Sequence, residues 1–437
     1  MRRGLPVRAS GCHRAPVRSG CKPVPGRGFG FAGPETAGWR LRPPDHRSPA
    51  TVPSLRRDWT LFALLSFCFA FGFAVYNGIF QNFIRETLGV GPRQFGVLES
   101  LREVPGLLTA FTAGTLVAFA EPRLAGISLA ATALGIAATA RAGGYWPLVA
   151  LTMFWSVGFH LWLALQPAIT MALSRGEEGG RRLGQMAAIG SASVLAALAL
   201  TRLARAWGFS YDTLFLIAGA AIMAAGLLGF GLSPAAAGGE RQRVVLRREY
   251  GLYYWLNFLE GCRRQIFMTF ASFALIVVYR TPVETMVTLA FINAAAAALA
   301  APTVGRWIDR VGERCMLTAY YALLVLVFCG YATVQDVRVL YGLYVLDSAL
   351  FTFGVGLTTY LHRIVRRDEL TPSLAMGMTM NHVAAVAVPA TGGALWQATG
   401  SYQLPFWIGV AIVGLSLAAA ARLPAAPRTA AAASSAD

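Results

Sequence analysis

The stretch "GRWIDRVGERCMLTAYYALLVLVFCGYATV" (305–334) joins a charged, glycine-containing segment to an apolar run of about 20 residues. A helix of that length crosses the roughly 30 Å hydrocarbon core of a bilayer. A second apolar run, residues 283–305, precedes the charged segment. The stretch therefore predicts two antiparallel transmembrane helices joined by a polar turn at one membrane surface.

Apolar runs of this kind recur along the whole chain. Hydrophobic residues make up 56% of the sequence and charged residues only 14%, against roughly a quarter charged in soluble proteins. We therefore predict an all-α polytopic membrane protein with 12 transmembrane helices. The runs cover approximately residues 59–82, 94–119, 124–142, 145–173, 183–202, 212–232, 251–279, 283–305, 315–334, 339–361, 372–396 and 402–421.

The longest polar connection, residues 233–250, divides these runs into two sets of six and is predicted to be a cytoplasmic loop. The two sets, residues 58–232 and 251–422, also resemble each other. "TLVAFAEPRL" (115–124) ends the second run as "TVGRWIDRVG" (303–312) ends the eighth. Internal repeats of this kind are typical of secondary transporters. The sequence predicts two pseudo-symmetric six-helix bundles.

Both chain ends are predicted to be disordered tails, residues 1–57 and 423–437. The first tail holds 12 Lys and Arg against Glu35 and Asp45 and is rich in Gly and Pro, a composition that does not support a packed core. An organelle transit peptide, or a true start near Val52, are the alternatives. Since the excess positive charge is concentrated in this tail, it does not indicate a nucleic-acid partner.

Arginines in the loops predict the orientation. With a cytoplasmic N-terminus, the inner loops carry fourteen arginines and the outer loops seven, as the positive-inside rule requires. We expect both termini in the cytoplasm, location in the cytoplasmic (inner) membrane of a bacterium, and a monomer. The six cysteines show no metal-binding or disulfide spacing, so no metal is expected.

The segment "GRWIDRVGER" (305–314) resembles the G-x-x-x-D-R-x-G-x-R signature that the major facilitator superfamily carries after its second and eighth spans. The resemblance extends over residues 58–422. It implies that Gly305 permits close helix packing and that Asp309, Arg310 and Arg314 form a cytoplasmic latch, with Gly312 completing the motif. The first loop departs from the pattern because Val117 stands where the leading glycine is expected.

Ionisable residues are unevenly distributed among the runs. The cores of the third, sixth, ninth and twelfth runs contain no charged residue and no histidine. The resemblance implies that these four helices face lipid. Ionisable residues inside membranes face bundle interiors or water-filled pathways. They occur in the second, fourth, seventh, tenth and eleventh runs: Glu99, Arg102, Glu103, His160, Glu260, Arg263, Arg264, Asp347 and His382.

The seventh run carries the densest cluster. Helical spacing places Asn257, Glu260 and Arg264 on one arc, where Glu260 reaches Arg264 at i,i+4. Arg263 lies at the edge of this arc, with Gln265 beyond it. We predict a proton-titratable Glu260 whose balance with Arg264 changes during transport, with a static ion pair as the alternative. The two arginines also suit an anionic solute.

Other polar residues complete the predicted pathway. Glu99, Arg102 and Glu103 share one helix face with Gly106 and suit either an entry site or structural pairing. Each histidine could be a solute or proton site, or simply a hydrogen-bonded residue. Asp347 is the alternative proton site. The remaining candidates are Asn77, Gln166 and Asn381.

Nothing in the sequence indicates an enzyme or a cofactor, because it contains no phosphate-binding G-x-x-x-x-G-K-[ST] loop and no nucleophile elbow. We predict a secondary active transporter that moves a small organic solute with protons by alternating access. A multidrug or metabolite exporter of the same fold is one alternative. A membrane receptor or assembly partner that transports nothing is the other.

Overall fold

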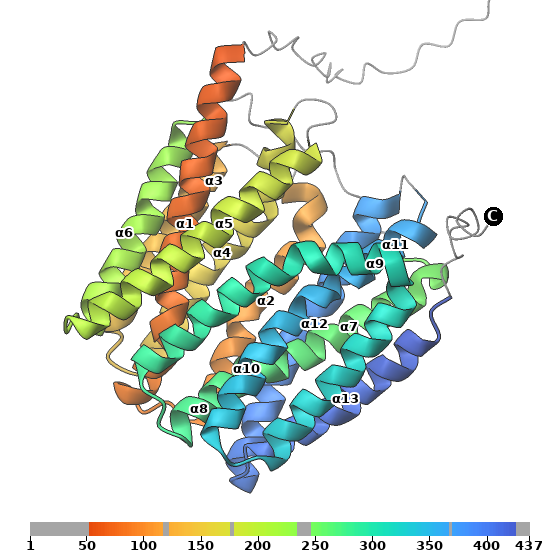
Figure 1. Ribbon diagram of the computed structural model, residues 1–437. Coiled ribbons are helices and arrows are strands. Elements are labelled where there is room, and N and C mark those ends of the chain that lie inside the picture. The colour runs from red at the N-terminus through yellow and green to blue at the C-terminus, as the bar shows by residue number, and fades with distance from the viewer. Residues whose placement is uncertain (1–51, 117–121, 175–178, 234–245, 367–368, 425–437) are drawn as a thin grey trace, which may run out of the picture. The chain divides into compact units, whose positions relative to one another are not determined.

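The computed structural model describes residues 52–116, 122–174, 179–233, 246–366 and 369–424. Every regular element in these ranges is a helix (Figure 1). The helices are α1 (Val52–Glu86), α2 (Pro92–Leu116), α3 (Pro122–Ala138), α4 (Tyr145–Ala172), α5 (Gly179–Ala206), α6 (Tyr211–Phe230), α7 (Gly251–Ile266), α8 (Ser272–Val277), α9 (Val283–Thr333), α10 (Val337–Phe351), α11 (Val355–Ile364), α12 (Leu370–Thr399) and α13 (Gln403–Ala421).

Each predicted apolar run coincides with helix, which confirms the twelve transmembrane helices. Four spans, the seventh to the tenth, do not correspond to one separate continuous helix each. The seventh run is α7, a π-helical turn at Phe267–Ala271 and α8, whereas the tenth is α10, a 3₁₀ turn at Thr352–Gly354 and α11. The eighth and ninth runs form the two parts of α9, which bends at Gly312.

Most of the two predicted tails and of the predicted central loop lies outside the described residues. These parts are residues 1–51 and 425–437 of the tails and residues 234–245 of the loop. The first helix begins at Val52, before the predicted boundary at residue 58.

Nine helical segments in the described ranges are long and apolar enough to cross a membrane by composition alone. The spans α2, α7–α8 and α12 do not meet this criterion, because charged or polar side chains interrupt them. These three helices pack against one another: α12 contacts α2 more extensively than any other helix pair, and it also packs along α7. Helices that face protein on several sides tolerate polar residues.

The helix contacts repeat between the two halves. Within the first half, α1 packs on α5 and α6, and α3 packs on α4 and α6. The corresponding pairs of the second half are α7 with α12 and α13, and α9 with α10 and α13. Each helix thus has the neighbours of the helix six spans away, which is the pseudo-symmetry predicted from the sequence.

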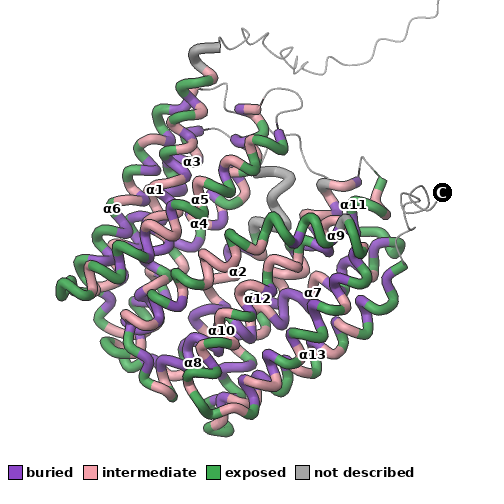
Figure 2. Tube along the Cα trace, viewed as in Figure 1, coloured by how far each residue is buried: buried purple, intermediate pink, exposed green. Residues whose placement is uncertain are grey.

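The two halves are joined at one end of the helices. Arg205 Nε of α5 lies 3.3 Å from Glu284 Oε1 of α9, and the rings of Phe95 and Phe273 stack with centroids 4.3 Å apart. Farther along α9, residues 290–303 include no buried residue; they are exposed or intermediate, the two classes drawn in green and pink in Figure 2. This part of α9 is therefore not buried against the first half, whereas α12 of the second half packs along α2 of the first.

Gly312 is required by the backbone of α9. Its φ of 75° and ψ of 159° lie in a region that is essentially restricted to glycine. Gly305, in contrast, has open space where a side chain would lie. The predicted close-packing role of Gly305 is therefore wrong, since this residue is exposed.

These two glycines give a matched test of the bend. Gly312→Val is expected to destabilise the protein by about 1–3 kcal/mol, because a β-branched residue is strained at this φ and ψ. Gly305→Val serves as the control and should shift the unfolding temperature much less. Thermal unfolding in detergent measures both. Equal shifts for the two variants would contradict a special role for Gly312.

Candidate functional site

A cluster of charged residues lies inside the second half; we call Glu260, Arg263, Asp347, Tyr320 and Tyr321 the C-half cluster. Arg263 is fully buried. Its Nε donates to Glu260 Oε1 at 2.9 Å, and its Nη1 lies 3.3 Å from Asp347 Oδ1. One guanidinium thus connects α7 to α10 and holds two carboxylates, as a charge removed from water requires.

Two tyrosines of α9 complete the C-half cluster. Tyr320 donates its hydroxyl to Glu260 Oε1 at 2.9 Å, and Tyr321 donates to Glu260 Oε2 at 3.2 Å. Arg263 also donates to the Tyr320 hydroxyl. Sequence reasoning missed both tyrosines, because they stand in a run without charged residues, where aromatic side chains usually serve packing.

The predicted pairing of Glu260 with Arg264 is wrong. Glu260 pairs with Arg263 at i,i+3. Arg264 instead donates from Nε to Met268 Sδ at 3.3 Å and lies over the Phe351 ring at 4.9 Å. None of the described carboxylates lies within ion-pair distance of Arg264. Both spacings bring residues to the same helix face, so the sequence could not decide between the two arginines.

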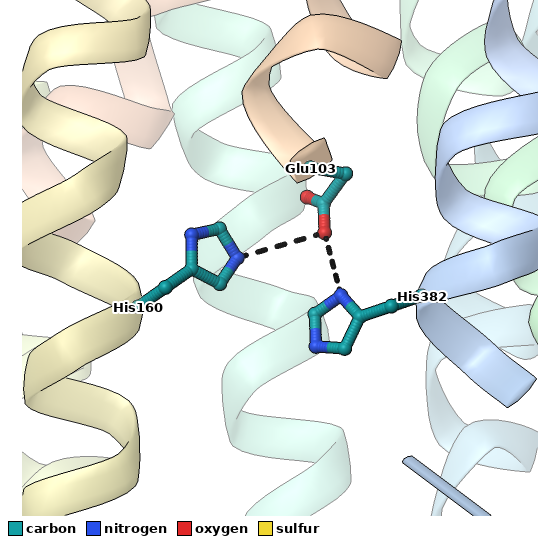
Figure 3. A group of neighbouring side chains, drawn as sticks. All are labelled: Glu103, His160 and His382. Carbon is teal, nitrogen blue, oxygen red and sulfur yellow. Dashed lines mark ion pairs between the residues drawn. The ribbon is translucent and has the colours of Figure 1, made fainter. Parts of the chain in front are cut away.

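A second cluster lies between the halves; we call Glu99, Arg102, Glu103, His160 and His382 the inter-half cluster. Arg102 Nη2 lies 2.9 Å from Glu99 Oε2 and 3.0 Å from Glu103 Oε1. The free oxygen of Glu103, Oε2, faces His160 Nε2 of α4 at 3.7 Å and His382 Nδ1 of α12 at 3.3 Å (Figure 3). The prediction treated these two histidines separately, and the fold brings them together.

Gly106 explains how the two rings come so close to α2. A Cβ at this position would lie 2.5 Å from the His160 ring and 2.7 Å from the His382 ring. The absence of a side chain at Gly106 thus provides the space in which Glu103 and the two imidazoles meet.

The remaining predicted residues divide into two groups. Asn381 Nδ2 lies 3.5 Å from Asn257 Oδ1, so this pair joins α12 to α7 beside the C-half cluster. Asn77, Gln166 and Gln265 make no side-chain hydrogen bond to either cluster within the described part of the chain. Their roles in a pathway stay predictions.

The predicted latch is tested only in part. The Asp309 side chain lies outside the described residues, whereas Arg310 and Arg314 are exposed. The ion pair that does form here joins Glu313 Oε2 to Arg363 Nη1 of α11 at 2.8 Å. Sequence reasoning missed this pair, because its partners come from separate helices.

Comparison with known proteins rests on structure alone, since no family model and no curated protein matches the chain. The nucleoside transporter NupG superposes with a TM-score of 0.67 at 14% identity, covering 84% of this chain and 98% of that structure. The protein has the major facilitator fold. A bacterial homologue of the human lysosomal transporter Spinster, inward-facing and occupied, gives 0.66 at 11% identity, covering 87% and 100%. The D-xylose–proton symporter gives 0.64 at 11%, covering 85% and 98%.

Within the major facilitator fold, the two clusters use the spans that the sequence marked. The side chains come from the second, fourth, seventh, ninth, tenth and eleventh spans. Of these, only the ninth lacked an ionisable residue in its core, and it contributes the two tyrosines. The arrangement gathers carboxylates, guanidiniums and imidazoles at mid-span, where they can bind an ion or a polar solute.

The neighbouring arginines make a direct comparison possible. Arg263→Ala is expected to destabilise the protein by about 3–5 kcal/mol, because it leaves two buried carboxylates without their cation. Arg264→Ala removes no ion pair and should have a much smaller effect. Thermal unfolding of the purified variants in detergent measures the difference. If Arg264→Ala proved as destabilising as Arg263→Ala, the assignment of partners would be wrong.

Proposed function

We propose that the protein is a secondary active transporter that moves a small organic solute across the cytoplasmic membrane by alternating access, coupled to protons. The observation that carries the proposal is a pair of buried charge clusters at mid-span in a major facilitator fold. Charged groups at this depth are costly, by about 2.5–3.5 kcal/mol each on insertion scales. They are expected where an ion or solute has to be bound.

The arrangement of the halves supports alternating access. With both termini in the cytoplasm, as the loop arginines favour, the end joined by Arg205 and Glu284 is the outer one. The inter-half cluster would then face the cytoplasm. The same orientation leaves the exposed residues 290–303 of α9 toward the inner side. We infer an inward-facing state that must open at the Arg205–Glu284 end to complete a cycle.

Arg264 is our candidate for solute binding. Among the described residues, its guanidinium has the Met268 thioether and the Phe351 ring as close partners. It also interacts electrostatically with Glu103 and Glu260 without pairing to either. An uncommitted guanidinium between the two clusters can accept a carboxylate or phosphate in bidentate geometry. This favours an anionic or zwitterionic solute.

Asp347 is our candidate for the proton site. Glu260 accepts hydrogen bonds from three side chains, Arg263, Tyr320 and Tyr321. Among the described residues, Asp347 pairs with Arg263 only, at the longer distance of 3.3 Å. Hydrogen bonds to a carboxylate stabilise its ionised form. Asp347 therefore has fewer partners that favour its ionised form than Glu260 has.

Flux measurements in proteoliposomes test the proposal. A panel of labelled organic anions, zwitterionic amino acids, nucleosides and pentoses should yield a solute whose accumulation requires a pH gradient. Collapsing the gradient with a protonophore should abolish accumulation. Flux that ignores the gradient would contradict proton coupling. Absence of flux for every solute, with correctly folded protein, would favour the receptor or assembly alternative.

Asp347→Asn tests the proton site directly. The variant should lose gradient-driven accumulation and retain solute exchange, because a neutral amide mimics the protonated acid. Asp212→Asn, an exposed acid in the first turn of α6, is the matched control and should accumulate solute like the wild type. Normal accumulation by Asp347→Asn would exclude this residue as the proton carrier.

The closed end can be tested through Gly96. A Cβ there would lie 2.1 Å from the Pro389 carbonyl oxygen, so Gly96→Leu should prevent closure at this end and slow transport. Spin labels at the facing helix ends should show longer distances in this variant. In the control, Gly190→Leu, the glycine faces open space, and the distances should not change. Unchanged distances in Gly96→Leu would contradict the assigned contact.

A multidrug or metabolite exporter remains the alternative within the same fold. The exposed helix surface of α9 suits a large apolar solute, whereas Arg264 and the paired carboxylates favour a polar one. Competition by cationic lipophilic dyes in the flux assay distinguishes them, because only the exporter reading predicts strong inhibition.

A further inference from the structure

We infer that Glu103, His160 and His382 form a binding site for a divalent transition-metal ion between the two halves. One carboxylate oxygen and two imidazole nitrogens, each from a different helix, point at a common space (Figure 3). All three ligand atoms lie within 4.8 Å of one another. The sequence predicted no metal site, because the three ligands are far apart in the chain and show no recognisable spacing.

The distances fit ligands around an absent ion better than hydrogen-bonded partners. Glu103 Oε2 lies 3.7 Å from His160 Nε2 and 3.3 Å from His382 Nδ1. Both values exceed the usual N–H···O range of about 2.7–3.2 Å. Two atoms bound to one ion at about 2.1 Å lie roughly 3.0–3.5 Å apart in octahedral or tetrahedral geometry. The Glu103–His382 pair lies within this range, whereas the other ligand atoms, all within 4.8 Å of one another, would have to move closer around an ion.

The hydrogen bond of one ring nitrogen of His160 decides which nitrogen presents a lone pair to the site. Its Nδ1 lies 2.9 Å from the backbone carbonyl oxygen of Ser156. A carbonyl oxygen only accepts, so in the neutral tautomer that makes this hydrogen bond Nδ1 carries the proton and Nε2 presents its lone pair to Glu103 Oε2; Nδ1 also lies 3.1 Å from the Ser156 hydroxyl. Histidines that bind metals are commonly oriented by a hydrogen bond from the other ring nitrogen to a carbonyl. A cation between Nε2 and Oε2 removes the repulsion between the two acceptors.

The carboxylates of the inter-half cluster are oriented by a neighbouring cation. Arg102 pairs with both Glu99 and Glu103, and Arg264 is a further cation that acts on Glu103. Arg102 occupies Oε1 of Glu103 and leaves Oε2 for the metal. Glu103 is thereby oriented by one partner while its second oxygen stays available.

The donor set selects the class of ion. Two imidazole nitrogens and one carboxylate oxygen suit Zn²⁺, Co²⁺, Ni²⁺, Fe²⁺ or Mn²⁺. Mg²⁺ and Ca²⁺ prefer oxygen ligands throughout. Three protein ligands also leave coordination positions for water or for a donor atom of a solute.

Metal binding would favour the conformation in which the halves are close. Glu103 and His160 belong to the first half, and His382 belongs to α12 of the second half. An ion bound by all three stabilises the arrangement in which they meet, by its difference in affinity for the two conformations. The site is therefore expected to bind metal in one state of the cycle and to weaken in the other.

Metal titration of the purified, tag-free, full-length protein in detergent tests the inference. After treatment with EDTA and its removal, Zn²⁺ and Co²⁺ should bind with one-to-one stoichiometry by calorimetry and raise the unfolding temperature. Mg²⁺ and Ca²⁺ at equal concentration should do neither. The Co²⁺ complex should show visible absorption bands that reflect nitrogen and oxygen ligands.

Variants at the ligands assign the site. Glu103→Gln and His382→Gln should each weaken Zn²⁺ binding by roughly tenfold or more, since even outer partners of metal ligands contribute about 10–100-fold. His382 is partly exposed, so its variant should fold even if one at the buried His160 does not. His362→Gln, an exposed histidine of α11 outside the cluster, is the matched control and should bind like the wild type.

The outcomes separate this inference from the proposed function. No saturable Zn²⁺ or Co²⁺ binding, equal affinity in His382→Gln and wild type, or an equal loss in His362→Gln would each overturn the site. These measurements require no transport, so a protein that carries a solute without binding metal refutes only the metal site. Metal binding without any solute flux would refute only the transporter.

Discussion

The buried guanidinium of Arg263 is the interaction on which the interior of the second half depends. A charge at this depth requires partners, and Arg263 finds them on three helices: Glu260 on α7, Tyr320 on α9 and Asp347 on α10. Removing the guanidinium would leave two carboxylates uncompensated in a medium of low dielectric constant, whereas removing one carboxylate leaves the guanidinium paired with the other. The pair of Arg263 with Asp347 thereby connects α10 to α7.

The inter-half cluster also pairs its buried charges, but part of this pairing depends on how the two halves are arranged. Its Glu99–Arg102–Glu103 part is satisfied within α2, but the second oxygen of Glu103 depends on His160 and His382. Because His382 belongs to the other half, this part of the cluster is complete only in one arrangement of the halves. The C-half cluster lies within one half, so its charges can stay paired when the halves move. The inter-half cluster is complete only when the halves are arranged as they are here.

The fold was predictable because the bilayer constrains the sequence more strongly than water does. Twelve apolar runs, the exclusion of charge from four of them, and the glycine at position 312 all follow from the cost of exposing polar groups to lipid or from backbone sterics. The charged residues and histidines of the two clusters were predictable, but the two tyrosines and the pairing were not. Helical periodicity alone cannot separate i,i+3 from i,i+4, and the choice of Arg263 depends on where α9 and α10 place Tyr320 and Asp347.

A single sequence does not reveal which residues of distant helices come together. Glu103, His160 and His382 each looked like an isolated polar residue in an apolar run, and only the packing of α2 against α12 and α4 unites them. The same limit produced the error at Gly305, where a motif implied close packing that the exposed helix surface does not provide.

The two neighbouring arginines of α7 have very different surroundings. Arg263 and Arg264 are successive residues, so their side chains leave the helix about 100° apart. The guanidinium of Arg263 is enclosed by protein, whereas that of Arg264 contacts a methionine and a phenylalanine ring. The π-helical turn follows directly, with the Phe267 amide shared between the carbonyls of Arg263 and Arg264. Such turns add a residue to the helical repeat and are frequent at functional sites. A change of the π-helical turn to regular α-helix would rotate Arg264 relative to Arg263. Arg263 is held in place by its ion pairs. Arg264 can thus change its surroundings during a conformational cycle at little electrostatic cost, whereas Arg263 cannot.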